Sequence, residues 1–179
     1  MELNLILAFA AGICGAYLLG SLPSAVWLGK WFHGIDVREH GSGNAGATNV
    51  FRVLGPGTAI PVLIIDALKG SAAVGLSGLA SNAFASSEWF LMYSLLLGAL
   101  ALLGHVFPLF AGFRGGKGIA TLAGIGLVLF PVEVLISLGV FILVFLPFRY
   151  VSLGSIMAAI AFPVAVWFVN DPPLFSQMG

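Results

Sequence analysis

Residues 119–147, IATLAGIGLVLFPVEVLISLGVFILVFLP, decide the fold because they set how often the chain crosses a membrane. One helical crossing needs roughly 20 apolar residues, at a rise of about 1.5 Å each. This stretch is too long for one comfortable crossing, and Pro131 and Glu133 stand in its middle. We therefore predict two short helices joined by a tight turn at Pro131, shielded from lipid by neighbouring protein.

Four further stretches are apolar and long enough to cross a membrane: residues 3–28, 53–80, 89–111 and 152–169. No basic residue precedes the first run, so we interpret it as a retained span, not a signal peptide. The motif Gly20–Ala25, GSLPSA, is expected to kink that span near its inner end, where polar groups either satisfy the backbone freed by Pro23 or line a substrate entrance. The prediction is an all-α polytopic integral membrane protein with six transmembrane helices.

Composition supports this class. The chain has 179 residues, of which 60% are hydrophobic and only 8% charged, whereas about a quarter of the residues in a soluble domain are charged. The net charge is zero, which gives no indication of a nucleic-acid partner. Cys14 is the one cysteine, so an intrachain disulfide is excluded.

The distribution of cations predicts the orientation, because cytoplasmic loops collect Lys and Arg. With the hairpin at Pro131, six of the seven cations fall on one side, and the opposite loops at 81–88, 131–133 and 170–179 have none. Those six are Lys30, Arg38, Arg52, Arg114, Lys117 and Arg149. The N-terminus is therefore expected outside, and three polar segments face the cytoplasm.

The first polar segment is residues 41–52, GSGNAGATNVFR. Its glycines let a ligand approach the backbone, and its Ser, Thr and Asn side chains offer hydrogen bonds. Arg52 follows Asn49 by three residues, so on a helix the two share a face, which suits an anion. The alternative is a flexible polar loop in which Ser42, Asn44, Thr48 or Asn49 caps a helix. Upstream, His33, Asp36 and His40 lack a metal-binding motif and are interpreted as solvated loop residues.

The second polar segment is residues 104–118, GHVFPLFAGFRGGKG, which runs directly into an apolar helix. Glycine N–H groups, the charges of Arg114 and Lys117 and the helix N-terminus together suit a phosphate. It is not a Walker A loop, since Gly118 stands where Ser or Thr would bind magnesium. The alternative is a basic juxtamembrane turn.

Two smaller features complete the polar inventory. The third segment, residues 149–155, places Arg149 and Tyr150 at headgroup level, with Ser152 as a cap of the next helix. Asp66 and Lys69 lie three residues apart on one face of the second span, where they neutralise each other. A functional pair and a structural staple are equally compatible with that spacing.

Five motifs in order carry a family resemblance: GSLPSA at 20–25, the segment 41–52, DALKG at 66–70, the segment 104–118 and RYVS at 149–152. Together they resemble the bacterial acyl-phosphate:glycerol-3-phosphate acyltransferases, the PlsY family, over essentially the whole chain. The resemblance implies transfer of a fatty acyl group from acyl phosphate to the 1-hydroxyl of sn-glycerol 3-phosphate, giving lysophosphatidic acid and phosphate. It also implies a single acyltransferase domain over 1–179 in the bacterial inner membrane, with a cytoplasmic active site and no cofactor or metal. The partners would be fatty acyl phosphate, glycerol 3-phosphate, membrane lipids and the soluble enzyme that makes acyl phosphate.

The resemblance also assigns roles to residues. Ser42, Arg52 and Lys117 would be catalytic, and His105 is a candidate base only by residue type. Asp66 and Lys69 are either structural or functional. The substrate-binding set would be Asn44, Thr48, Asn49, His105, Gly112, Arg114, Gly115, Gly116, Gly118 and Ser152.

Two other classes were weighed against an enzyme. A small transporter or channel for an organic phosphate or another anion would also need glycines and intramembrane charge, but its polar residues should reach the midplane and both faces. A membrane scaffold leaves residues 41–52 without a purpose. Family members usually carry one more span, seven in all, and a tail with His and Asn, so we expect residues 1–179 to be incomplete at the C-terminus.

The topology is testable by labelling single cysteines in a Cys14→Ala background. Residues 29–52, 112–118 and 147–151 should label from the cytoplasmic side, because the cations gather there. Labelling of positions near Arg149 from the outside alone would mean that the hairpin at Pro131 is wrong.

Overall fold

The computed structural model describes residues 2–84 and 86–170, and its elements there are helices. The chain divides into two compact units, residues 1–128 and 129–179, which are described separately. The first unit contains α1 (Glu2–Gly20), α2 (Ser24–His33), η1 (Val37–Glu39), α3 (Ala47–Leu54), α4 (Pro56–Gly75), η2 (Leu76–Ala83), α5 (Ser87–Val106), η3 (Leu109–Ala111) and α6 (Ile119–Leu129). The second contains α7 (Pro131–Phe148) and α8 (Val151–Asn170).

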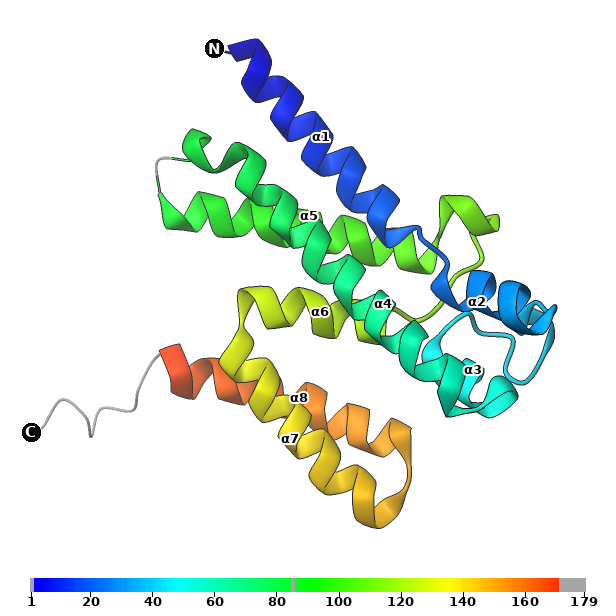
Figure 1. The fold of residues 1–179 in the computed structure, drawn as a ribbon. Helices are drawn as coiled ribbons and strands as arrows, with labels where there is room; N and C mark the ends of the chain where they lie inside the picture. The colour runs from blue at the N-terminus through cyan, green and yellow to red at the C-terminus, as the bar shows by residue number, and fades with distance from the viewer. Residues whose placement is uncertain (1, 85, 171–179) are drawn as a thin grey trace, which may run out of the picture. The chain divides into compact units, whose positions relative to one another are not determined.

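Helices α1, α4 and α5 pack against one another, and α2 and α3 gather against α4 (Figure 1). Glycines allow the closest approach. A Cβ at Gly20 would overlap the Ala101 backbone, and a Cβ at Gly104 would overlap the backbone of Tyr17. Small residues at a helix crossing permit this contact in membrane proteins, where packing rather than water expulsion drives association.

Helix α6 packs on α4 in the same way. A Cβ at Gly70 would overlap the Thr121 carbonyl oxygen, and a Cβ at Gly124 would overlap that of Ala67. The Ser71 hydroxyl adds a 2.8 Å hydrogen bond to the Gly124 carbonyl. With 11 residues, α6 is only about 16 Å long, too short to cross a hydrocarbon core of about 30 Å. Protein contact on α4 therefore supplies the shielding expected for a short helix.

The predicted break at Pro131 is confirmed, since α6 ends at Leu129 and α7 begins at Pro131. Only α6 is short, however, because α7 has 18 residues and is long enough to cross a membrane. Five segments of the described chain have the length and hydropathy of a span: Leu3–Gly20, Pro56–Ala83, Ser87–Ala111, Pro131–Phe148 and Val151–Val169.

The prediction of one kinked span over residues 3–28 is wrong. Helix α1 ends at Gly20, and α2 is a separate helix that begins at Ser24. Pro23 has no N–H and adopts φ −90° and ψ 69°, with the Ser24 N–H bonded to the Leu22 carbonyl at 3.1 Å. This tight turn of the inverse γ type stops the helix and turns the chain.

In the second unit, α7 and α8 form an antiparallel hairpin joined at Arg149 and Tyr150. Arg149 ends α7 in the left-handed conformation, with φ 57°, and donates its N–H to the Phe145 carbonyl at 2.8 Å. Gly154 lies against the Phe141 ring, where a Cβ would be 2.9 Å from Cδ2. Ser152 is the second residue of α8, so the expectation that it caps this helix is wrong.

The glycine contact between α4 and α6 predicts the effect of two matched substitutions. Gly70→Ala places a methyl group against the Thr121 carbonyl, whereas Gly75→Ala on the same helix meets no atom within 4 Å. We expect Gly70→Ala to lower the melting temperature in detergent and Gly75→Ala to leave it unchanged or raise it slightly, because Ala favours a helix by about 1 kcal/mol over Gly. Equal melting temperatures for the two variants would contradict the close packing of α6 on α4.

Candidate functional site

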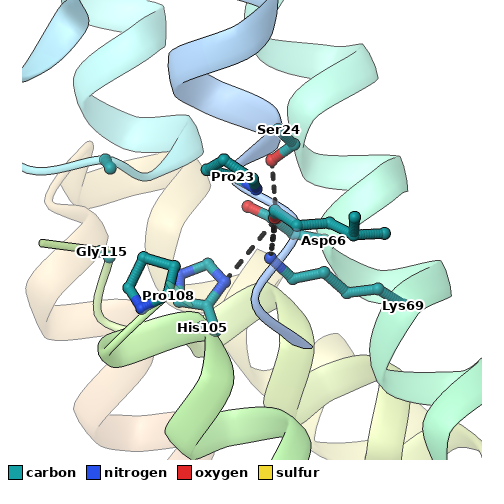
Figure 2. Close-up of a pocket in the computed structure, with 10 residues that line it drawn as sticks. Pro23, Ser24, Asp66, Lys69, His105, Pro108 and Gly115 are labelled. Carbon is teal, nitrogen blue, oxygen red and sulfur yellow. Dashed lines mark hydrogen bonds and ion pairs between the residues drawn. The ribbon is translucent and has the colours of Figure 1, made fainter. Parts of the chain in front are cut away.

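A buried carboxylate lies among side chains from α2, α4 and α5 (Figure 2). Asp66 on α4 is 1% exposed. Its Oδ1 accepts a 2.7 Å hydrogen bond from the Ser24 hydroxyl and lies 2.9 Å from Lys69 Nζ and 3.7 Å from His105 Nδ1. Lys69 also donates to the Leu22 carbonyl at 2.8 Å. The ion pair therefore ties the turn between α1 and α2 to α4 and α5.

His105, near the end of α5, connects this cluster with residues 41–52, called the first loop below, and residues 107–118, called the second loop. The ring is buried, and its Nδ1 lies 3.1 Å from the Thr121 hydroxyl. A Cβ at Gly116 would overlap His105 Nε2 and lie 2.8 Å from the Ala45 carbonyl oxygen. Gly116 is therefore in contact with both the histidine and the first loop, and a larger residue would separate them.

Gly115 and Gly116 do not present free N–H groups. Gly115 donates to the Val106 carbonyl at 3.1 Å, and Gly116 donates to the His105 carbonyl at 3.2 Å. The loop thus folds back over the end of α5. The expectation that these two N–H groups are open to a phosphate is not met, because closing the loop consumes them.

A small cavity of about 10 Å³ lies inside this cluster. Such a volume holds about one water molecule and no substrate. A ligand larger than water would therefore have to bind outside this cavity. The cavity is lined by Leu22, Pro23, Ser24, Ala45, Asp66, Lys69, His105, Pro108, Gly115 and Gly116.

Asn49 holds the first loop together. It is 2% exposed, and its amide nitrogen donates to the carbonyls of Val37 at 2.9 Å and His40 at 3.1 Å. Its amide oxygen accepts from the Ser42 N–H at 2.8 Å and the Ser42 hydroxyl at 3.1 Å. All hydrogen-bonding capacity of the amide is engaged within the loop, so Asn49 positions Ser42 and has no group left for a ligand.

Helix α3 presents Thr48, not Asn49, beside Arg52. Thr48 and Arg52 are both exposed and one turn apart, whereas Asn49 is buried. Asn49 and Arg52 do lie three residues apart on one helix, as predicted, but the burial of Asn49 leaves Arg52 as the exposed member of that pair. The capping alternative is wrong, because Gly46 caps α3 and no side chain does.

Three cations lie within the two loops, and a fourth, Arg38, precedes the first loop. The side chains of Arg52, Arg114 and Lys117 are exposed and form no hydrogen bond or ion pair within residues 2–84 and 86–170. The fourth, Arg38, is engaged with Asp36 and with the second loop. Gly112 and Gly118 have positive φ of 63° and 74° and shape that loop. Asn44 is half-buried in the first loop, and Ser152 lies in the second unit.

The Asp36 and Arg38 side chains form a bidentate ion pair outside the spans. Arg38 Nε donates to Asp36 Oδ1 at 2.9 Å and Nη2 to Oδ2 at 2.7 Å. These hydrogen bonds hold the pKa of Asp36 well below its usual range, and Asp36 raises the pKa of Arg38. The stability that the pair contributes is therefore present above the usual carboxyl pKa of about 4 and is lost as the pH falls below it.

Sequence reasoning did not assign Ser24, Arg38 or Thr121 to the site. Ser24 belonged to a motif interpreted as a helix kink, and Thr121 begins an apolar helix as its third residue. Their partners are 42, 73 and 16 residues away along the chain. No local spacing signals such contacts. His33 pairs with the Thr58 hydroxyl at 2.7 Å, and among the described residues no group of His, Cys, Asp or Glu is arranged to hold a metal ion.

Comparison with known proteins defines the class. The sequence profile of the family described as glycerol-3-phosphate acyltransferase matches residues 10–178. A glycerol-3-phosphate acyltransferase of Chlorobaculum tepidum is 48% identical over 165 residues, covering 89% of this chain and 71% of that protein. One from Fusobacterium nucleatum is 44% identical over 173 residues, covering 95% of this chain and 84% of that protein. The chain belongs to the glycerol-3-phosphate acyltransferase family.

Two solved structures share the fold. Both are crystal structures of PlsY, an integral membrane glycerol 3-phosphate acyltransferase, one in its glycerol 3-phosphate form and one in its lysophosphatidic acid form. The TM-scores are 0.77 and 0.75, with 38% and 37% identity, covering 93% of this chain and 79% of PlsY. This chain is thus an all-helical, polytopic integral membrane protein of the PlsY family.

The buried ion pair predicts a strong loss of stability when one partner is removed. Asp66→Asn leaves the Lys69 ammonium in an apolar interior without its counterion, which should cost about 3–5 kcal/mol. Thermal unfolding in detergent measures the effect. The double variant Asp66→Asn with Lys69→Met removes both charges and should recover part of the loss. If the double variant is no more stable than the single one, uncompensated charge is not the cause.

Proposed function

We propose that this chain transfers a fatty acyl group from acyl phosphate to the 1-hydroxyl of sn-glycerol 3-phosphate, giving lysophosphatidic acid and phosphate. The observation that carries the proposal is the family match over residues 10–178. The PlsY crystal structures in glycerol 3-phosphate and lysophosphatidic acid forms add support, because their names give one substrate and the product.

The geometry supports a reaction between two anionic substrates. The first loop carries Ser42, Thr48 and Arg52, and the second carries Arg114 and Lys117. The two loops meet where Gly116 contacts the Ala45 carbonyl. Lys117 directly follows Gly116 in sequence, and Arg52 lies exposed on α3, which begins two residues after Ala45. Phosphate groups are bound well by such cations. We assign acyl phosphate to the first loop and glycerol 3-phosphate to the second.

We propose direct transfer without an acyl-enzyme. The hydroxyl oxygen of glycerol 3-phosphate forms a bond to the acyl carbonyl carbon, and the bond from that carbon to the phosphate oxygen breaks. The phosphate leaves with the electron pair, and one of its oxygens takes the hydroxyl proton. The Ser42 hydroxyl donates to the amide oxygen of Asn49 at 3.1 Å, and an amide oxygen is no base able to activate a serine.

In this scheme the protein contributes position and charge. Arg52 and Lys117 stabilise the negative charge that develops on the carbonyl oxygen and the leaving phosphate. His105 is 5% exposed, and its Nδ1 faces Thr121 and Asp66. We therefore assign His105, with Asp66 and Lys69, to holding the second loop in place, and not to proton transfer.

The proposal extends to location and partners. We propose five full spans and α6 as a sixth, short crossing shielded by protein, with the N-terminus outside. Residues 1–179 would be part of one acyltransferase domain, with an active site on the cytoplasmic face of the bacterial inner membrane. The one-sided distribution of Lys and Arg supports this orientation. The acyl phosphate would then come from a soluble enzyme on that side, and Ser152 would contact a substrate phosphate.

The test is product formation by the purified 179-residue chain in lipid vesicles. Palmitoyl phosphate and labelled glycerol 3-phosphate should yield lysophosphatidic acid and phosphate in equal amounts, whereas palmitoyl coenzyme A should yield none. In the same assay, Lys117→Ala should raise the KM for glycerol 3-phosphate by roughly 10- to 150-fold, which corresponds to about 1.5–3 kcal/mol for a hydrogen bond to a charged group.

Lys117→Arg keeps the charge and serves as the control, since it should recover much of the affinity. The proposed function is overturned if folded protein forms no lysophosphatidic acid either as residues 1–179 or when extended by the last span and tail that the family resemblance implies. Vesicle uptake of labelled glycerol 3-phosphate without product would favour the transporter class instead.

A further inference from the structure

Arg38 joins the two loops from outside the buried cluster. Its side chain is 16% exposed although it carries a permanent charge. One edge of the guanidinium holds both oxygens of Asp36, and the other nitrogen, Nη1, donates to the carbonyls of Ala111 at 2.6 Å and Arg114 at 3.3 Å. These carbonyls lie 73 and 76 residues further along the chain. Arg38 thus connects η1, just before the first loop, with the second loop.

The carbonyls that Arg38 holds stand on either side of a strained turn. Gly112 and Phe113 both have positive φ, 63° and 59°. Glycine adopts this conformation freely, but an aromatic residue does so at a cost of about 1 kcal/mol or more. From inside the segment, the Phe113 N–H donates to the Pro108 carbonyl at 2.9 Å. From other parts of the described chain, Arg38 is the side chain that hydrogen-bonds residues 109–114.

We propose that Arg38 is a positioning residue that fixes the second loop, and with it Lys117, at the distance from Ser42 and Arg52 that acyl transfer needs. The inference rests on the proposed function for its kinetic consequence. Arg38 touches no substrate in this proposal. It acts through the backbone of Ala111 and Arg114, and Asp36 orients the guanidinium for that contact.

Only arginine meets this geometry. A planar guanidinium binds a carboxylate along one edge while its remaining N–H groups point to two carbonyls. A lysine ammonium is a single point of charge and cannot reach both sides. Lys30 shows the contrast in the same cluster, because Nζ lies 3.2 Å from Asp36 Oδ2 and the side chain is half exposed. Lys30 pairs with the same carboxylate as Arg38 but forms no hydrogen bond to the second loop among the described residues.

Lys30 therefore provides the matched control. Arg38→Gln and Lys30→Gln each remove one positive charge next to Asp36, but only Arg38→Gln releases the second loop. We expect Arg38→Gln to raise the KM for glycerol 3-phosphate about tenfold, because misplaced groups lose binding and rate together. The KM for palmitoyl phosphate should stay within about twofold of wild type, as should both constants in Lys30→Gln. A purely structural defect would lower the active fraction, and so the apparent kcat, without changing KM.

Arg38→Lys separates geometry from charge. It keeps the positive charge but loses the planar guanidinium that binds Asp36 and both carbonyls. Its KM for glycerol 3-phosphate should therefore resemble that of Arg38→Gln. A wild-type KM in Arg38→Lys, or an equal increase in Lys30→Gln, would overturn the proposal, since either would show that net charge alone matters. Unchanged KM values in both Arg38 variants would overturn it as well.

Hydrogen–deuterium exchange over residues 107–118 tests, without any turnover, whether Arg38 holds the second loop in place. Exchange should be faster in Arg38→Gln and Arg38→Lys than in wild type, and unchanged in Lys30→Gln. If active wild-type enzyme and its Arg38 variants exchange alike, Arg38 does not hold the second loop. If wild type forms no product either as residues 1–179 or when extended, the proposed function fails, and the exchange rates still decide whether Arg38 holds the loop.

Discussion

The first unit depends on keeping one ionised carboxylate in an apolar interior. Asp66 is 1% exposed, and an isolated charge there would cost many kcal/mol. Lys69 neutralises it, and the Ser24 hydroxyl supplies a further hydrogen bond at 2.7 Å. Ser24 reaches Asp66 because Pro23 ends α1 and lets α2 begin at this depth. The same pair therefore holds the turn after the first helix against α4 and links α4 with α5.

Glycine contacts link this buried cluster with the two loops. Gly116 fits between His105 and the Ala45 carbonyl, so the position of a buried ring sets how closely the two loops meet. Gly115 and Gly116 use their N–H groups to close the loop over α5. Gly115 and Gly116, which look like part of a phosphate cradle in the sequence, thus serve packing, and the proposed function leaves anion binding to the exposed cations beside them.

The sequence predicted those parts of the fold that depend on local chemistry. Apolar length gave the long helices, because about 20 apolar residues are needed to cross a membrane. Pro131 gave the break between α6 and α7, because proline cannot continue a helix hydrogen-bond pattern. The same reasoning predicted that Pro23 kinks one helix, whereas Pro23 separates two helices. Whether a proline bends or ends a helix depends on what satisfies the neighbouring backbone, and here Lys69 bonds the Leu22 carbonyl.

By itself, the sequence determined the class of protein, the family and the residue types of the two loops, because composition and motifs are properties of the chain alone. Only the tertiary structure decided which of those residues are free to meet a ligand. Asn49 and Arg52 are three residues apart on α3, yet the amide of Asn49 is buried and fully hydrogen-bonded, whereas Arg52 is exposed. Asp66 and Lys69, which the sequence pairs by spacing alone, belong to a buried network that includes His105. The physical reason is that hydrogen bonds such as Arg38 to Ala111 join residues 73 positions apart, and no local pattern records that distance.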